Sequence, residues 1–209
     1  MLYDTSVIDP SVTYKLMTAT VTPRPIAWVT TKARNGTLNA APYSFFNAMG
    51  HEPPTLVIGL LRDPDKGFKD SAENIISTGE FVVNLVPAAL ADQMNVTAVQ
   101  APSQIDELAL ARLETEASSK IASPRIKGAP VAFECSLFSA VVTGPKQTIA
   151  IGRIEAIHVD DAMLIDAERG HVDNAALDLI ARLHGSGWYV KGGERFKIDR
   201  PAPITDGDT

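Results

Sequence analysis

Apolar and polar residues alternate over several short stretches of the chain, the pattern typical of β-strands with one buried face. Residues 26–31 predict one strand and residues 38–41 its hairpin partner, joined through Asn35-Gly36, a pair that strongly favours a tight turn. Pro42 is expected to end this ladder because proline has no N–H to donate. Residues 43–47 are then expected to form a loop rich in hydroxyl and amide groups, and residues 62–67 a polar loop. Further strands are expected at residues 81–86, 131–142 and 148–159, the last with a bulge at Gly152.

Residues 55–61 differ from these stretches because they are apolar at nearly every position. Such a run predicts a strand that is buried on both faces, or a barrel strand whose outer face packs against another subunit. The second interpretation leads us to expect a homodimer.

Two segments carry helical patterns. Residues 72–78 predict a helix, with Asp70 and Glu73 at capping-box spacing and Gly79 at the position where a helix stops. Residues 174–183 place apolar side chains at i, i+3, i+4 and i+7, which predicts an amphipathic helix.

Residues 88–116 have a different character. They lack strand alternation, are acidic, and predict two short helices separated at Ala101-Pro102. We interpret the segment as an excursion from the succession of strands. It is either a solvated pair of surface helices, a lid over a site, or an element of a dimer interface.

The many short strands and tight turns favour a mainly β fold, an antiparallel barrel of roughly six strands with flanking helices. The length of 209 residues fits one domain that spans residues 1–209. The net charge of −6 argues against broad nucleic-acid binding, which needs a basic face. Cys135 is the one cysteine, so no intrachain disulfide can form.

The beginning of the chain lacks the basic and apolar regions of a signal peptide. No apolar run approaches the roughly 20 residues that a membrane helix needs. We therefore expect a cytoplasmic protein that does not associate with a membrane.

Several kinds of catalytic site are not supported by the sequence. The histidines do not pair at metal-ligand spacing and no Cys/His cluster exists, so no metal site is expected. No phosphate-binding P-loop or Gly-x-Gly-x-x-Gly motif follows a predicted strand, and no Gly-x-Ser-x-Gly elbow is present.

One local pattern does predict an anion site. Lys69-Asp70-Ser71 stands at a predicted helix start, where unpaired N–H groups and a partial positive charge attract anions. The alternative is that Asp70 and Ser71 only cap the helix. Arg24 lies between two prolines that hold it extended, either aimed at a ligand or solvated at the entry to a strand.

Five motifs occur in order along the chain: TPRPIAWVTT (22–31), NAAPYSFFN (39–47), EPP (52–54), KDS (69–71) and EFVVN (80–84). Together they resemble the flavin reductase-like family of FMN-binding split barrels, over roughly residues 10–200. This family includes flavoredoxin-like proteins and the reductase components of two-component monooxygenases. Glu52 stands where an aspartate is commoner in the family, and Ser71 where a threonine is commoner.

The resemblance implies a Greek-key antiparallel split β-barrel, a homodimer, and FMN bound near the dimer interface. It also implies an NAD(P)H-dependent flavin reductase, in which NADH or NADPH passes a hydride to FMN for use by a monooxygenase partner or oxygen. No side chain is assigned as a catalytic acid or base, because the flavin carries the chemistry. The alternatives are an FMN electron carrier without its own nicotinamide site, and a flavin-dependent oxygenase or oxidase acting on a small organic substrate.

The resemblance also implies which residues bind FMN. Those expected around the phosphate and the ribityl chain are Ser44, Asn47, Lys69, Asp70 and Ser71. Those expected along the edge of the ring are Trp28, Thr30, Ala41, Pro42 and Tyr43. Arg24 is expected to reach the phosphate or the pyrimidine end of the ring.

Overall fold

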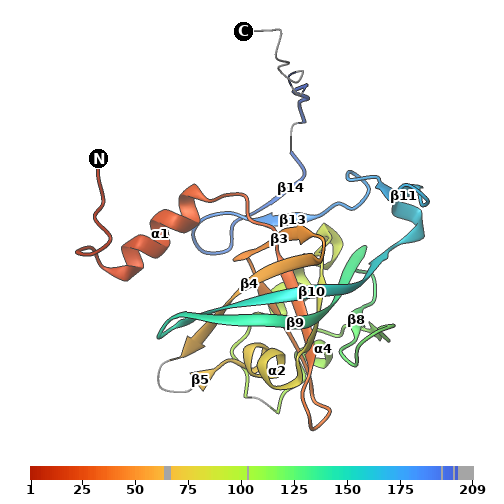
Figure 1. The fold of residues 1–209 in the computed structure, drawn as a ribbon, viewed down its shortest axis with the longest axis horizontal. Coiled ribbons are helices and arrows are strands. Elements are labelled where there is room, and N and C mark those ends of the chain that lie inside the picture. The colour runs from red at the N-terminus through yellow and green to blue at the C-terminus, as the bar shows by residue number, and fades with distance from the viewer. Residues whose placement is uncertain (64–66, 103, 194, 200, 202–209) are drawn as a thin grey trace.

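The computed structural model describes residues 1–63, 67–102, 104–193, 195–199 and 201 (Figure 1). Its centre is an eight-stranded antiparallel sheet with the order β2-β1-β6-β9-β10-β4-β3, and β5 pairs with β4. The strands are β1 (Ala27–Lys32), β2 (Leu38–Tyr43), β3 (Phe46–His51), β4 (Pro54–Asp63), β5 (Gly67–Phe68), β6 (Glu80–Asn84), β9 (Val131–Gly144) and β10 (Gln147–Val159). This architecture confirms the mainly β, antiparallel prediction.

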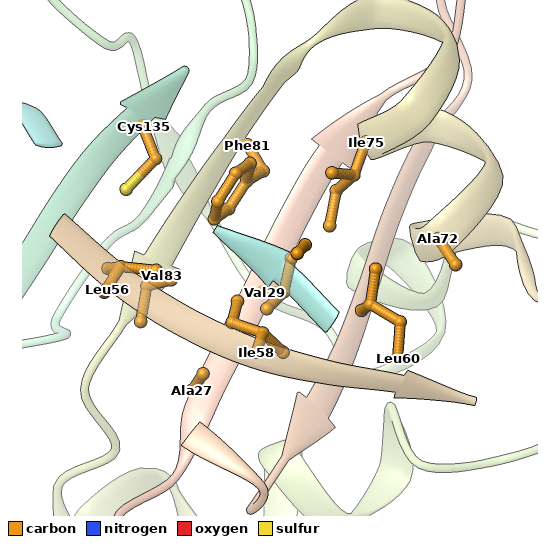
Figure 2. Packing of buried hydrophobic residues seen from close by; sticks show 11 residues of the cluster. Ala27, Val29, Leu56, Ile58, Leu60, Ala72, Ile75, Phe81, Val83 and Cys135 are labelled. Atoms are coloured by element: carbon orange, nitrogen blue, oxygen red, sulfur yellow. The ribbon is translucent and has the colours of Figure 1, made fainter. Parts of the chain in front are cut away.

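The sheet curls around a core of buried apolar side chains (Figure 2). Its members are Ala27, Val29, Leu56, Ile58, Leu60, Ala72, Ile75, Phe81, Val83, Cys135 and Ala150. The predicted bulge at Gly152 is confirmed by a shift of register between Ile151 and Gly152. A Cβ atom on Gly152 would lie 2.5 Å from Phe81 Cζ, so the glycine leaves the room that this ring occupies.

The hairpin between β1 and β2 is confirmed, and Gly36 adopts a φ of 91° in its turn. The prediction that Pro42 ends the ladder is wrong, because Pro42 pairs with Trp28 and β2 continues to Tyr43. β2 is at the edge of the sheet, where alternate N–H groups point away from the neighbouring strand. Proline is tolerated at such a position because the missing N–H would not have paired with β1.

Residues 43–47 were expected to form one loop. β3 begins at Phe46, so only Ser44 and Phe45 lie between the two strands, and Asn47 is a strand residue. The predicted polar loop at 62–67 lies partly outside the described residues, at 64–66.

β4 does not have two buried faces in this chain. Leu56, Ile58 and Leu60 are buried, whereas Val57 is partly exposed and Leu61 is 47% exposed. The first interpretation of this apolar run is therefore wrong, and the outer face of β4 is left for another contact.

Helices flank the barrel at α1 (Pro10–Thr20), α2 (Asp70–Thr78), α3 (Ala91–Val96) and α4 (Glu107–Leu110), with 3-10 turns at Ala88–Leu90 and Asp161–Met163. Helix α2 is the one predicted at 72–78, and Gly79 ends it with a φ of 76°. The capping-box prediction is wrong, because Lys69 is the N-cap residue and Asp70 already lies inside the helix.

The excursion at 88–116 contains α3 and α4 on either side of Ala101-Pro102, as predicted, although Ser103 lies outside the described residues. It ends in β7 (Thr115–Glu116), which pairs with β8 (Arg125–Ile126). Met94 and Leu108 are almost fully buried against Trp28 in a second core cluster. The interpretation as a merely solvated helix pair is therefore wrong.

The helix predicted at residues 174–183, all of which the structure describes, does not form. Asp173 turns the chain by accepting hydrogen bonds from the backbone N–H groups of Ala175 and Ala176, and Asp178 adopts a φ of 44°, which interrupts any helix. The chain then forms β13 (Ile180–Arg182), which pairs with β14 (Tyr189–Lys191). Two short strands, β11 (Leu164–Asp166) and β12 (His171–Val172), pair before this turn. Among the described residues, no helix has the length and apolar character to cross a membrane.

Candidate functional site

Helix α2 begins with an exposed lysine. Lys69 occupies the N-cap position, and no side chain that the structure describes caps this end of the helix. Lys69 forms no ion pair with a residue that the structure describes. The first-turn N–H groups of an α-helix lack partners within the helix, so this end combines N–H donors with a cation.

The hydroxyl of Ser71, in the first turn of α2, belongs to a buried polar network. Its Oγ atom lies 2.6 Å from the side-chain amide of Asn39 on β2, and the Tyr43 hydroxyl lies close to it. Burial raises the pKa of Tyr43 to about 12, and the nearby carboxyl groups of Asp70 and Glu107 add to the rise. Tyr43 therefore stays protonated at neutral pH and can donate a hydrogen bond.

Glu107 completes this network, and sequence analysis did not identify it. Its side chain reaches from α4 to β2, where Oε2 accepts a hydrogen bond of 3.3 Å from the backbone N–H of Ala40. The Asn39 amide satisfies all its neighbours when its oxygen accepts from Ser71 Oγ and its nitrogen donates to Glu107 Oε2 at 3.3 Å. The only signal in the sequence was a glutamate directly before Leu108 in a segment already predicted to be helical.

Arg24 is buried rather than solvated at the entry to a strand. Its guanidinium donates to the carbonyl oxygens of Thr18 (2.7 Å), Val21 (2.8 Å) and Leu183 (3.0 Å), and its Nε donates to Ser44 Oγ at 3.4 Å. These bonds use four of the five guanidinium N–H groups. Arg24 thus ties the end of α1 and the C-terminal strands to Ser44.

Trp28 and Thr30 point away from this network into the second core cluster. The indole of Trp28 is fully buried, and its Nε1 donates to Thr97 Oγ1 at 2.9 Å. Thr30 is equally buried, and its hydroxyl donates to the Pro124 carbonyl oxygen. In this chain the two side chains support the barrel wall behind the site.

The remaining candidates lie along the free edge of β2 and on β3. Ala41, Pro42, Tyr43 and Ser44 are partly exposed, and Asn47 is exposed on β3, with its Oδ1 accepting from the backbone N–H of Ala48. The structure therefore brings together Tyr43, Asp70 and Ser71 beside Lys69, and separately Arg24 with Ser44. Trp28 and Thr30 belong to neither group.

An open apolar groove of about 640 Å³ adjoins Phe45, between α1 and the outer face of the sheet. Tyr14 and Phe45 both line it, and their ring centroids lie 6.1 Å apart with an angle of 42° between the ring planes. The other residues that line it are Thr5, Pro10, Thr13, Met17, Val57, Gly59, Gln147 and Ile149.

Comparison with known proteins identifies relatives over nearly the whole chain. An uncharacterized protein of Deinococcus radiodurans is 40% identical over 202 residues, which are 95% of this chain and 88% of that protein. Nitrilotriacetate monooxygenase component B of Bacillus cereus is 33% identical with a TM-score of 0.89, covering 95% of this chain and 98% of that one. Pseudomonas fluorescens 2-nitrobenzoate 2-nitroreductase is 31% identical with a TM-score of 0.87, covering 99% and 100%.

A split-barrel protein of Shewanella frigidimarina superimposes with a TM-score of 0.80 over 96% of this chain and all of its own, at 20% identity. At this identity the likeness concerns the fold alone, and it confirms the split barrel. A family model described as a flavin reductase like domain matches residues 18–174. The chain therefore belongs to the flavin reductase-like family.

Proposed function

We propose that the protein binds FMN and acts as an NAD(P)H-dependent flavin reductase. The observation that carries this proposal is the exposed Lys69 at the N-cap position of α2, near the Ser71 and Tyr43 hydroxyls. Membership of the flavin reductase-like family supports it, as does the likeness to a monooxygenase component B at 33% identity.

The residues at the start of α2 fit a phosphate group. The Lys69 ammonium and the first-turn N–H groups supply donors, and such charge-assisted bonds to phosphate are stronger than neutral ones. Asp70 lies close enough to Tyr43 and Glu107 for its charge to raise the pKa of both groups. Because Asp70 would repel an anion, the phosphate would bind beside the Lys69 ammonium.

The other candidates fit the rest of the molecule. The ribityl hydroxyls would meet Ser44 and Asn47, with Ser71 held in place by Asn39. The edge of the ring would lie along Ala41, Pro42 and Tyr43, where β2 has a free edge. Arg24 would orient Ser44 through its Nε, while Trp28 and Thr30 keep the wall behind the site rigid.

When bound, FMN supplies the redox chemistry by accepting a hydride from NADH or NADPH and passing electrons onward. This chain's own residues bind and orient, and we assign no general acid or base among them. Reduced flavin would serve a monooxygenase partner or oxygen, in keeping with the likeness to a monooxygenase component.

We further propose a homodimer formed through the outer face of the sheet. Strand register places Val57, Ile151, Ile149 and Val141 on this face, in line with Leu61. Val141 and Leu61 are each 47% exposed, and an exposed apolar face of this kind is typical of an interface. The groove beside Phe45 opens on the same face, so a second copy would cover it.

A second candidate is a flavoenzyme that reduces a small organic substrate directly. The likeness to a 2-nitrobenzoate 2-nitroreductase at 31% identity favours it, and the apolar groove beside Phe45 has room for an aromatic ring. In this case reduced flavin would be reoxidised by the organic compound on the enzyme.

Steady-state oxidation of NADH and NADPH by the purified protein tests both candidates. A flavin reductase consumes nicotinamide in proportion to added FMN, with oxygen as the terminal acceptor. A substrate reductase oxidises NADH or NADPH slowly with FMN alone, and the rate of this oxidation increases strongly when a nitroaromatic acid is added under anaerobic conditions. Absence of oxidation in both assays, with FMN bound, would leave the electron-carrier interpretation instead.

A further inference from the structure

A buried carboxyl group lies at the junction of the excursion and the barrel. Glu107 is 4% exposed and sits on α4, yet no lysine, arginine or histidine that the structure describes forms an ion pair with it. Buried carboxylates usually have a cationic partner because a lone buried charge is costly. An unpaired glutamate in this position therefore needs an explanation.

The contacts of Glu107 all lead to the proposed flavin site. Oε2 accepts from the N–H of Ala40, on the same free edge of β2 that continues through Pro42. The Asn39 amide links the same oxygen to Ser71, at 3.3 Å from Glu107 and 2.6 Å from Ser71 Oγ. The carboxyl thus fixes both the strand edge and the start of α2.

Among the described residues, the charged groups that act on Glu107 are two carboxylates, Asp106 directly before it in the chain and Asp70 on α2. The Tyr43 hydroxyl on β2, which is neutral, also lies near it. Burial raises the pKa of Glu107, and the two aspartates raise it further, while hydrogen bonds from backbone N–H groups oppose the rise. The carboxyl is therefore near the balance between its neutral and ionised forms at a higher pH than an ordinary glutamate.

We propose that Glu107 is a positioning residue that couples the excursion at 88–116 to the phosphate end of the flavin site and sets FMN affinity through its charge. This inference rests on the proposed function, because it requires a phosphate beside Lys69. A phosphate adds one to two negative charges close to the Asn39–Ser71 link. The ionised form of Glu107 then opposes binding, and the neutral form does not.

The sign of the effect follows from linkage. FMN binds better when Glu107 is protonated, so binding raises the pKa of this carboxyl further and takes up protons. As the pH rises and Glu107 ionises, FMN affinity falls by about three- to tenfold, the size expected for repulsion between unit charges at a partly screened site. Riboflavin, which has no phosphate, lacks most of this effect.

The test measures the dissociation constants of FMN and riboflavin for the wild type and Glu107→Gln from about pH 5 to about pH 9. The phosphate's own ionisation affects both proteins equally, so the dissociation constant of the wild type divided by that of Glu107→Gln reports Glu107 alone. We expect this ratio for FMN to be near one at low pH and to rise about three- to tenfold as the pH increases. For riboflavin it should stay near one.

The matched control is Glu114→Gln, which removes the same charge from an exposed position of the excursion that pairs with Lys127. It should show no such pH-dependent ratio. Should Glu107→Gln fail to fold, Glu107→Met keeps the length of the side chain without its charge and should give the same ratio.

Two outcomes would overturn the inference. One is a ratio for FMN that does not change with pH, and the other is an equal rise for FMN and riboflavin, which would make Glu107 a support of the fold alone. Both leave FMN binding by the wild type intact. A wild type that fails to bind FMN at any pH would instead overturn the proposed function, and this inference with it.

Discussion

The indole Nε1 of Trp28 donates a hydrogen bond to Thr97 Oγ1 at 2.9 Å, across the boundary between the barrel and the excursion. Both residues are almost fully buried, and Thr97 Oγ1 in turn donates to the Met94 carbonyl oxygen at 2.8 Å. The excursion is therefore anchored in the second core cluster, so α3 is part of the folded wall. Leu108 on α4 is buried in the same cluster, so both helices of the excursion belong to the folded wall.

Thr97→Val should lower the free energy of unfolding by about 1–3 kcal/mol, because it leaves the buried Trp28 N–H without an acceptor. Urea denaturation followed by tryptophan fluorescence measures the change. Thr97→Ser keeps the hydroxyl, so its free energy of unfolding should fall clearly less than that of Thr97→Val. Equal stabilities for the valine variant and the wild type would mean that the hydrogen bond contributes nothing net.

The environment of Glu134 on β9 leads us to expect that the free energy of unfolding falls at acidic pH. The side chain is fully buried, and its carboxylate accepts from the backbone N–H groups of Ser119 (2.7 Å) and Lys120 (2.6 Å) and pairs with His158. Burial alone would raise the pKa of Glu134, but these bonds outweigh it and lower the pKa below its ordinary value of 4.5. Stabilisation is therefore present above about pH 4.5, the unfolded value, and is lost as the pH falls through the folded one.

Glu134→Gln should remove this dependence, so the stability of the variant should fall less steeply between about pH 5 and about pH 3 than that of the wild type. Denaturation midpoints at a series of pH values measure it. Glu116→Gln is the control, because the Glu116 side chain is exposed and pairs with Arg125 at the surface, and it should leave the loss of stability in acid unchanged. Parallel acid limbs for the wild type and Glu134→Gln would contradict the prediction.

The parts of the fold that local pattern decides were predictable from the sequence. Alternation and Asn35-Gly36 were sufficient for the β1–β2 hairpin, because the turn depends on the φ of 91° that Gly36 adopts. Pro42 was misjudged because its effect depends on whether β2 is an edge strand, which only the sheet order reveals. The pattern at 174–183 matched a helix, but Asp178 with its φ of 44° and the Ile180 N–H bond to the Val86 carbonyl favour a strand.

The candidate site divides in the same way. Lys69 and Ser71 could be found because helix-start chemistry is local, and Gly79 fixes where that helix ends. Glu107 could not be found, because its importance comes from a contact with β2, far away in the sequence. Trp28 belongs to one of the five motifs, but the motif does not indicate which face of β1 its indole occupies.

Gly152→Ala should destabilise the fold by about 1–3 kcal/mol, because its Cβ would overlap the Phe81 ring in a packed core. Gly144→Ala is the matched control, since a Cβ there meets nothing within 4 Å. Thermal unfolding of the two variants measures the difference. Combining Gly152→Ala with Phe81→Leu should recover part of the loss, and no recovery would show that the ring is not the cause.

Val141→Asp should dissociate the proposed homodimer, because it places a charge beside Ile149 on the apolar outer face that also includes Val57, Leu61 and Ile151. Light scattering should report about twice the chain mass of 22.4 kDa for the wild type and the chain mass for the variant. Ile165→Asp, at a 70% exposed position on β11, should leave the dimer intact. A monomeric wild type would contradict the interface directly.

Lys69→Ala should weaken FMN binding about ten- to hundredfold, the effect expected when a charge-assisted hydrogen bond to a phosphate is lost. The helix start supplies only about half a positive charge, so the ammonium group is needed to neutralise more of the negative charge of the phosphate. Riboflavin binding should hardly change, because riboflavin has no phosphate, and this contrast separates a phosphate contact from damage to the fold. Lys127→Ala removes a lysine paired with Glu114 instead and should affect neither ligand. Equal FMN affinity for Lys69→Ala and the wild type would return Lys69 to the role of a solvated surface residue.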